Sequence, residues 1–163
     1  MLEDWDERMA AVWADDSLTD VERIARIDTL AGERDPDDAR ALFERAGARD
    51  SAGLEADAER LYRRALEAGL DEEHRTQATI QLASTLRNLG RTDEALQMLQ
   101  AEYVSGPGTA FHDAAAAFYA LALASSGEAL AAASIALKAL APHLPRYTRS
   151  VAAYAEDLVG DGD

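Results

Sequence analysis

Glycine recurs at one fixed spacing along the chain, and this feature constrains the fold more than any other. Positions 53, 90 and 127 are glycine, so each lies 37 residues from the next. When the segments are aligned on these glycines, a small residue recurs five positions later, at Ala58, Ala95 and Ala132. A period of this length is typical of chains built from one repeated supersecondary unit. The sequence therefore predicts one structural unit used three times.

Each predicted unit consists of two helices that meet at its glycine. The segment before Gly90 has helical spacing, with apolar residues at Leu82, Ala83, Leu86 and Leu89 expected in the core. Glycine adopts the left-handed conformation that ends a helix, so Gly90 should end this one. Thr92 is then expected to cap the next helix, with Asp93 and Glu94 in its first turn.

The remaining segments also have helical periodicity and no sustained alternation of strand type. The sequence therefore predicts an all-α fold of about nine antiparallel helices. The first helix is expected over Glu3–Ala14 and the last over Arg146–Val159. Thr19 and Glu22 have the spacing of a capping box. Asp35, followed by Pro36, is expected to cap another helix.

Composition excludes several classes of function. The net charge of −15 disfavours binding to nucleic acid and to anionic membranes, which need a basic face. The chain has no cysteine, which excludes disulfides and thiolate chemistry. Its acidic start does not resemble a signal peptide, and its longest apolar run is too short to span a bilayer. A cytoplasmic protein is therefore predicted.

The hairpin LASTLRNLGRTDEALQML resembles the tetratricopeptide repeat, a helix–turn–helix unit that stacks into a right-handed superhelix. The resemblance rests on Leu82, Ala83 and Leu86 before Gly90, on Ala95 and Leu99 after it, and on Pro107 at the family's helix-ending place. The neighbouring units match at Ala46, Gly53, Ala58, Tyr62 and Ala65, and at Ala120, Leu123, Gly127, Ala132 and Ala139. The whole chain is also similar to a group of small bacterial tetratricopeptide proteins.

The resemblance implies a division of a single domain into repeats. They are expected at residues 39–75, 76–112 and 113–145, after an N-terminal cap or degenerate repeat at 1–38 and before a capping helix and tail at 146–163. Three features depart from the family. The period is 37 where the family has ~34. Arg49 replaces an aromatic residue, and Glu102 replaces a small one.

In this family the first helices of the units line a concave groove, so the resemblance implies that a protein or peptide binds there. Helical register selects as candidates Arg40, Phe43, Gln77, Ile80, Gln81, Ser84, Arg87, Asn88, Phe118, Leu121 and Tyr154. Phe118 and Tyr154 have an alternative place, buried against a neighbouring helix. Some family members bind a terminal carboxylate with Lys and Asn. Only Arg87 and Asn88 resemble that arrangement, so a carboxylate ligand is not predicted.

No constellation of catalytic residues stands out, and no cofactor or metal site is predicted. The three histidines are more than thirty residues apart, and there is no HExxH motif, phosphate loop or nucleophile elbow. His74 is expected to be a solvated junction residue. The acidic runs DPDDAR and LDEEHR could bind calcium weakly, but helix caps explain them better. The chain is therefore predicted not to be an enzyme.

Two functions remain open, with a third less favoured. The first is a protein-binding adaptor that uses the groove. The second is a structural homo-oligomer, because residues 95–145 contain only four charged residues, Glu102, Asp113, Glu128 and Lys138. Such a charge-poor half is explained either by a covering partner, such as a second copy in a homodimer, or by close packing of alanine-rich helices. The third is a subunit whose chemistry lies on a partner chain.

Overall fold

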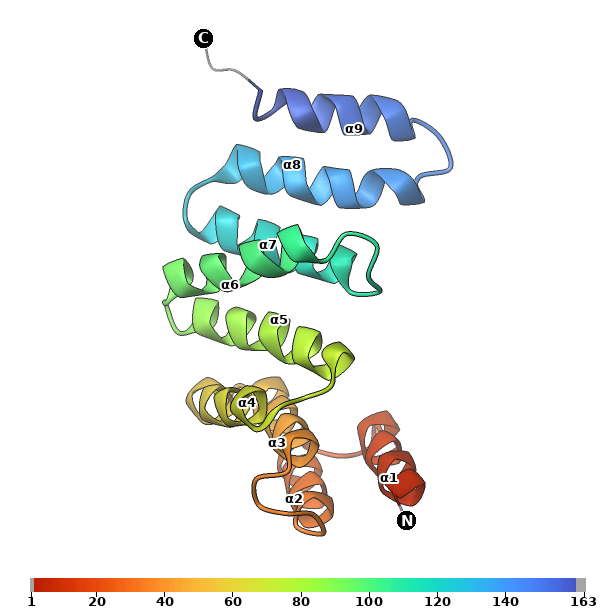
Figure 1. The fold of residues 1–163 in the computed structure, drawn as a ribbon, viewed down its shortest axis with the longest axis vertical. Helices are drawn as coiled ribbons and strands as arrows, with labels where there is room; N and C mark the ends of the chain where they lie inside the picture. Colours follow the sequence, from red (N-terminus) through yellow and green to blue (C-terminus); the bar gives the residue numbers. More distant parts are fainter. Residues whose placement is uncertain (1, 161–163) are drawn as a thin grey trace. The chain divides into compact units, whose positions relative to one another are not determined.

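The computed structural model describes residues 2–160, which form nine α-helices and one short 3₁₀ helix (Figure 1). The prediction of an all-α chain of antiparallel helices is therefore confirmed. The elements are α1 (Leu2–Ala14), α2 (Asp20–Ala31), α3 (Ala39–Ser51), α4 (Glu55–Ala68), α5 (Glu72–Asn88), α6 (Thr92–Ser105), α7 (His112–Ser125), α8 (Ala129–Leu140), η1 (Ala141–His143) and α9 (Thr148–Asp157).

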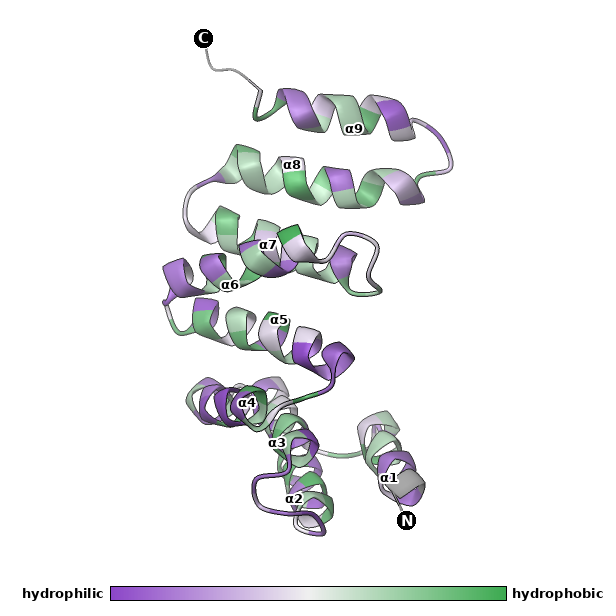
Figure 2. Cartoon of the chain, viewed as in Figure 1, coloured by the Kyte–Doolittle hydropathy of each residue, from purple (hydrophilic) through white to green (hydrophobic). Residues whose placement is uncertain are grey.

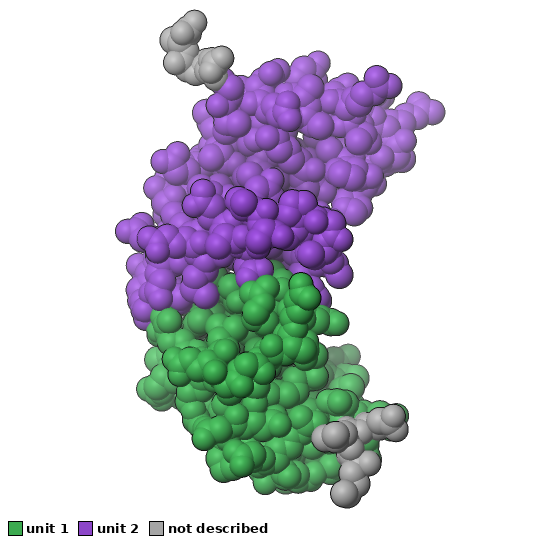
Figure 3. All heavy atoms as spheres, in the orientation of Figure 1, with its two compact units in different colours: residues 1–85 green, residues 86–163 purple. Residues whose placement is uncertain are grey.

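The helices group into two compact units, coloured separately in Figure 3. Unit 1 extends to Thr85, and unit 2 begins at Leu86, so the boundary falls within α5. In unit 1, α2 packs against α1 and α3, and α3 packs against α4. In unit 2, α7 packs against α6 and α8, and α8 packs against α9. Helices adjacent in sequence are thus neighbours within each unit.

The three recurrent glycines make the same turn. Their φ angles are positive, +73°, +82° and +92°, a conformation that residues with a side chain rarely adopt. The N–H of the following residue donates to the carbonyl oxygen five residues earlier, at 2.8 Å for Leu54, 2.8 Å for Arg91 and 2.9 Å for Glu128. The glycine N–H bonds within the same loop in all three turns. These are the two bonds of a Schellman motif, which ends a helix and satisfies its last carbonyls.

The structure corrects two of the predicted helix caps and confirms a third. Arg91, not Thr92, is the N-cap of α6: its carbonyl oxygen accepts from the Ala95 N–H at 3.2 Å, and its side chain makes no capping hydrogen bond. Asp38, not Asp35, caps α3, and its Oδ1 accepts from the Ala41 N–H at 2.8 Å. Asp35 instead starts the turn that precedes α3. The capping box of Thr19 and Glu22 is confirmed.

The aligned alanines are contact positions between neighbouring helices. Ala58 and Ala95 are 0% exposed and Ala132 is 7% exposed, because small residues let neighbouring helices approach to about 8–10 Å. Leu82, Ala83 and Leu86 are buried, also as predicted. The prediction for Leu89 is wrong, since its side chain is 39% exposed. Leu89 follows the last residue of α5 and so leaves the buried face of that helix.

The N-terminal helix is part of the core of unit 1. Trp5 and Met9 are buried in a cluster with Ile27, Leu30 and other apolar residues of α2 and α3. The Trp5 indole N–H donates to the Leu30 carbonyl oxygen at 2.8 Å, and this bond satisfies the polar atom of the buried ring. Val12 and Trp13 pack on the same cluster. These four residues therefore anchor α1 to the core of unit 1.

An ion-pair cluster explains why Arg49 replaces the aromatic residue expected from the family. The Arg49 Nη2 lies 2.8 Å from Asp28 Oδ2, and the Arg45 Nε lies 3.0 Å from Asp28 Oδ1. Burial opposes ionisation of Asp28, but the two arginines outweigh it and hold the pKa of the carboxyl below its usual value. The cluster joins α2 to α3, so Arg49 connects the N-terminal segment to the first hairpin.

The C-terminal part of unit 2 is apolar and ends in a short helix. Figure 2 shows hydrophobic colouring along most of α8, which contains one charged residue, Lys138. The last helix begins at Thr148 and ends at Asp157, two residues inside each predicted end. Tyr147 has a φ of +71° and directly precedes it. Within residues 2–160, no helix combines the length and the apolar character needed to cross a bilayer.

The burial of Ala95 gives a direct test of the packing. Ala95→Leu should lower the free energy of unfolding by roughly 1–3 kcal/mol, because the extra non-hydrogen atoms of leucine would not fit between closely packed helices. Ala101→Leu, at an exposed position of the same helix, should leave stability nearly unchanged. Chemical denaturation of the two variants measures the difference. Equal stabilities would contradict the close contact at the aligned alanines.

Candidate functional site

Four of the predicted groove residues line a single cavity in unit 1. They are Arg40 and Phe43 on α3 and Gln77 and Gln81 on α5. Ile80, also predicted to face the groove, is only 4% exposed and therefore belongs to the interior. Ser84 is partly buried and does not line this cavity. The structure therefore brings these four candidates together on α3 and α5, and their part in binding stays a prediction.

The cavity has a volume of about 420 Å³ and is enclosed by α1, α3, α4 and α5. Aromatic rings form much of its lining, which besides the four residues above consists of Trp13, Glu44, Gly47, Asp50, Ser51, Tyr62 and His74. Phe43 connects two of these rings. Its ring centroid lies 6.3 Å from that of Tyr62 and 5.6 Å from that of His74. A cavity of this size that combines aromatic and polar groups is suited to hold a ligand group.

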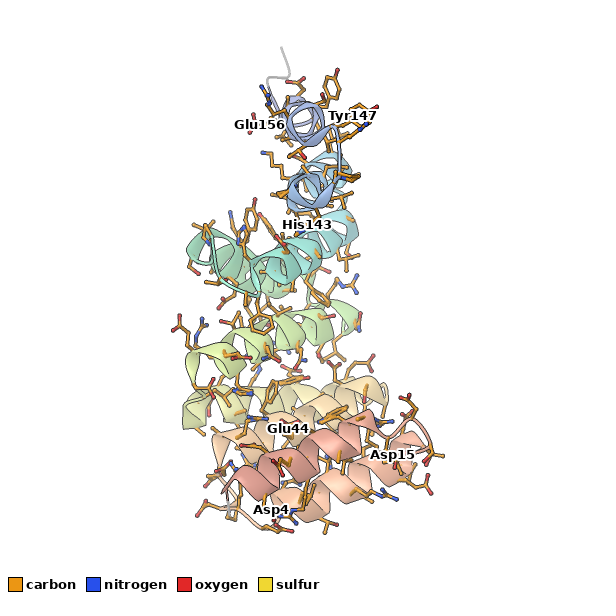
Figure 4. The ribbon with its side chains drawn as sticks, turned by 90° about the vertical axis from the view of Figure 1, so that its right-hand side faces the viewer. Asp4, Asp15, Glu44, His143, Tyr147 and Glu156 are labelled. Atoms are coloured by element: carbon orange, nitrogen blue, oxygen red, sulfur yellow. The ribbon has the colours of Figure 1, made fainter. Side chains whose placement is uncertain are left out.

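Glu44 is a buried carboxylate of the cavity lining whose two oxygens both accept hydrogen bonds. Its side chain, labelled in Figure 4, is only 7% exposed. The indole N–H of Trp13 donates to Oε2 at 2.7 Å, and Arg40 donates to Oε1 from Nε at 3.0 Å and from Nη2 at 2.8 Å. Arg40 and Glu44 are four residues apart on α3, the spacing that brings helical side chains together. The two charges therefore pair within one helix, and Arg40 Nη1 also lies 3.8 Å from Asp6 Oδ1 on α1.

Asp50 carries the second negative charge of the lining, and neutral hydroxyl groups hold it. Thr85 Oγ1 lies 3.1 Å from Asp50 Oδ1 and 2.9 Å from the Gln81 carbonyl oxygen, so its one hydrogen is shared between two acceptors, and the Tyr62 hydroxyl lies 3.3 Å from Asp50 Oδ2. The same Tyr62 hydroxyl lies 3.0 Å from Gln81 Oε1. Because a hydroxyl has one hydrogen, Tyr62 donates to only one of these two acceptors at a time.

Burial is the main influence on the protonation of this cluster. It raises the pKa of Asp50 above its usual value, although the hydrogen bonds from Thr85 and Tyr62 act in the opposite direction. The charge of Glu55 adds to the rise. Burial, and after it the charge of Asp50, also raises the pKa of Tyr62, so this phenol stays protonated. Asp50 further lies in the last turn of α3, where the helix dipole disfavours a negative charge.

His74 differs from its prediction as a solvated junction residue. Its side chain is only 20% exposed, and its ring meets that of Phe43 edge-on, at an interplanar angle of 75°. Its Nδ1 lies 2.6 Å from Asp71 Oδ2, and its backbone N–H donates to Asp71 Oδ1 at 3.0 Å. The bond from this N–H lowers the pKa of Asp71. His74 is therefore fixed in place as part of the cavity wall.

Gly47 explains how Trp13 reaches the cavity. A Cβ atom at Gly47 would lie 3.4 Å from Trp13 Cζ2, so the tryptophan packs directly on the backbone of α3. Sequence reasoning missed Trp13, Gly47, Asp50 and Tyr62 as site residues. The available signal was the face of α3, where Arg40, Phe43, Gly47 and Asp50 follow one another at helical spacing.

The other predicted groove residues belong to unit 2. Arg87 and Asn88 are neighbours at the end of α5, with Arg87 Nη2 donating to Asn88 Oδ1 at 3.3 Å. Phe118 is partly buried, and Leu121 is exposed. Tyr154 is exposed, which corrects the alternative of a buried position for this side chain. Within residues 2–160, no group of three or more side chains has the composition and placement of a metal site.

The unpaired charge of Asp50 leads to a prediction about stability. Asp50→Asn should raise the melting temperature at pH 7, because it removes a buried charge while keeping a side chain that can bond to both hydroxyls. The native pKa of Asp50 is raised, so its destabilising effect grows as the pH rises through that value and is absent below the unfolded-state pKa. The advantage of the variant should therefore shrink in acid.

Thermal denaturation followed by circular dichroism at several pH values measures this effect. The matched control is Asp57→Asn, which removes an exposed carboxylate paired with Arg60. It should change stability by less than about 1 kcal/mol. A lower melting temperature for Asp50→Asn than for the native chain at pH 7 would contradict the description of Asp50 as an uncompensated charge.

The comparison with protein families agrees with the helical hairpins. Residues 39–158, most of the chain, match the family model described as "Tetratrico peptide repeat". No curated protein and no solved structure matches the chain. The matched region begins with α3, the helix that supplies most of the cavity lining, and includes all three Schellman turns. The chain therefore belongs to the tetratricopeptide repeat family.

Proposed function

We propose that the chain is a protein-binding adaptor and that the cavity of unit 1 receives a segment of its partner. Repeat domains of this family generally mediate interactions between proteins. The observation that supports this site is the aromatic lining of Trp13, Phe43, Tyr62 and His74 around a cavity of about 420 Å³. Aromatic side chains dominate the energetics of protein interfaces, and the amides of Gln77 and Gln81 provide hydrogen bonds at the same place.

Several finer statements belong to the same proposal. The chain has no catalytic activity of its own and acts in the cytoplasm, and its resemblance to small bacterial proteins suggests a bacterial source. The repeats occupy residues 39–75, 76–112 and 113–145. The predicted residues of unit 2, namely Arg87, Asn88, Phe118, Leu121 and Tyr154, stay candidates for further contacts with the partner.

A cavity-filling substitution tests the proposal. Peptides enriched from a random library on the native full chain should bind Gln77→Trp at least tenfold more weakly, because the indole would occupy the cavity. The matched control is Gln100→Trp, which places the same side chain at an exposed position of α6. Fluorescence anisotropy with labelled peptides measures both affinities. Peptides that bind the two variants equally well would place the interaction elsewhere.

Self-association through unit 2 is the second candidate function, and exposed leucines favour it. Leu121 on α7 and Leu130 and Leu140 on α8 are 46%, 62% and 49% exposed. Exposed apolar side chains on neighbouring helices offer a surface that a partner can cover. A second copy could cover it in a symmetric dimer.

Sedimentation velocity over a range of concentrations tests this alternative. A dimer held by these leucines should dissociate on dilution, and Leu130→Asp should give the monomer mass, near 17.5 kDa, at every concentration. Gln97→Asp, at an exposed position of α6, is the control for added charge and should not change the native association. A native chain that is monomeric throughout would eliminate this function.

A further inference from the structure

We propose that the cavity of unit 1 binds a cationic group of the partner, the guanidinium of an arginine or the ammonium of a lysine, with Asp50 as the counter-charge. This inference rests on the proposed function, since it states which part of a partner segment enters the cavity. It is carried by the charge balance of the lining, by the placement of Asp50 and by the aromatic rings beside it.

The charged side chains that line the cavity do not cancel, and one carboxylate has no basic partner in the part of the chain that the structure describes. Arg40 and Glu44 pair at 2.8 Å, and Trp13 adds a further hydrogen bond to Glu44. Among residues 2–160, hydrogen bonds to Asp50 come only from the hydroxyls of Thr85 and Tyr62, and each of these hydroxyls has a second acceptor on Gln81. Across residues 2–160, no arginine, lysine or histidine forms an ion pair with Asp50. With histidine neutral, the lining therefore has a net charge of −1, located at Asp50.

The surroundings of Asp50 make an incoming cation more favourable than a neutral group. Covering Asp50 with an apolar side chain would bury its charge without compensation, which is costly. A cation would instead pair with the carboxylate. The end of α3 would favour the same sign of charge, because the helix dipole is negative at the C-terminus. A carboxylate ligand, by contrast, would be repelled by Asp50, and the only lining arginine already pairs with Glu44.

The aromatic lining suits the same ligand. Trp13 and Phe43 line the cavity together with Asp50, and Phe43 is 7% exposed. Tyr62 also borders the cavity, but its side chain is 0% exposed. A cation near the face of an aromatic ring is attracted by the ring's quadrupole, and the attraction grows when water is excluded. Guanidinium and ammonium groups carry alkyl stems, which would contact the rings while the charge reaches the carboxylate. One side chain of the partner could thus use both features of the cavity.

The test uses small probes on the full chain. Nuclear magnetic resonance titrations at fixed ionic strength would compare N-acetyl-arginine amide, N-acetyl-lysine amide and N-acetyl-citrulline amide, the neutral isostere of the first. A saturable shift of the Tyr62 and Gln81 side-chain resonances is expected with a cationic probe, and the preferred probe identifies guanidinium or ammonium as the ligand. Asp50→Asn should raise its dissociation constant at least tenfold, whereas Asp57→Asn should leave it within twofold.

Three results would overturn the inference. The first is that the citrulline probe binds as tightly as the arginine probe. The second is that both aspartate variants weaken binding equally. The third is that neither cationic probe gives saturable shifts at Tyr62 and Gln81. Failure of the proposed function has a different signature. In that case no selected peptide would distinguish Gln77→Trp from Gln100→Trp. A third outcome separates the two. If selected peptides bind Gln77→Trp more weakly than Gln100→Trp, but lack arginine and lysine and bind Asp50→Asn as tightly as the native chain, the adaptor function stands and the cation inference fails.

Discussion

The left-handed glycine turn is the constraint on which the rest of the structure depends. Two backbone hydrogen bonds close each turn, so the backbone alone directs the chain into the next helix. The residue after the glycine is free to vary, and it is Leu54, Arg91 or Glu128 in the three turns. The turn also sets the approach of the paired helices. In the first hairpin this approach brings Tyr62 on α4 to within 3.3 Å of Asp50 on α3, so the turn that builds the scaffold also builds the cavity.

Much of the fold could be predicted from the sequence because it depends on local backbone preferences and on helical periodicity. The glycine spacing located the turns, and the alanines aligned with it are buried. The missed caps have local physical reasons. Thr92 looked like a cap, but the Arg91 carbonyl oxygen already accepts from the Ala95 N–H, so Arg91 is the N-cap of α6. Asp35 and Asp38 both have capping side chains, and the turn begun by Asp35 and Pro36 leaves the capping position to Asp38.

The candidate site was less predictable because helical register identifies a face and not its neighbours. Register selected Arg40, Phe43, Gln77 and Gln81, and these four residues line the cavity from α3 and α5. It could not show that a tryptophan from α1 packs on Gly47, nor that His74 meets Phe43. Asp50 shares a face with Phe43, yet most aspartates of this acidic chain lie in solvent. Only the packing of α3, α4 and α5 shows that Asp50, unlike those aspartates, is held by buried hydroxyl groups.

Trp13 gives the N-terminal helix a part in the chemistry of the cavity. The family match begins at residue 39, whereas Trp13 lies well before it and still forms one wall and fixes Glu44. The repeats therefore supply a scaffold that is common to the family, and a segment outside the shared pattern completes its recess. Exchange of the leading helix would change the wall that Trp13 forms while the hairpins stay as they are. If the cavity receives a partner segment, as proposed, its preference for one partner over another could thus change without any alteration of the repeating unit.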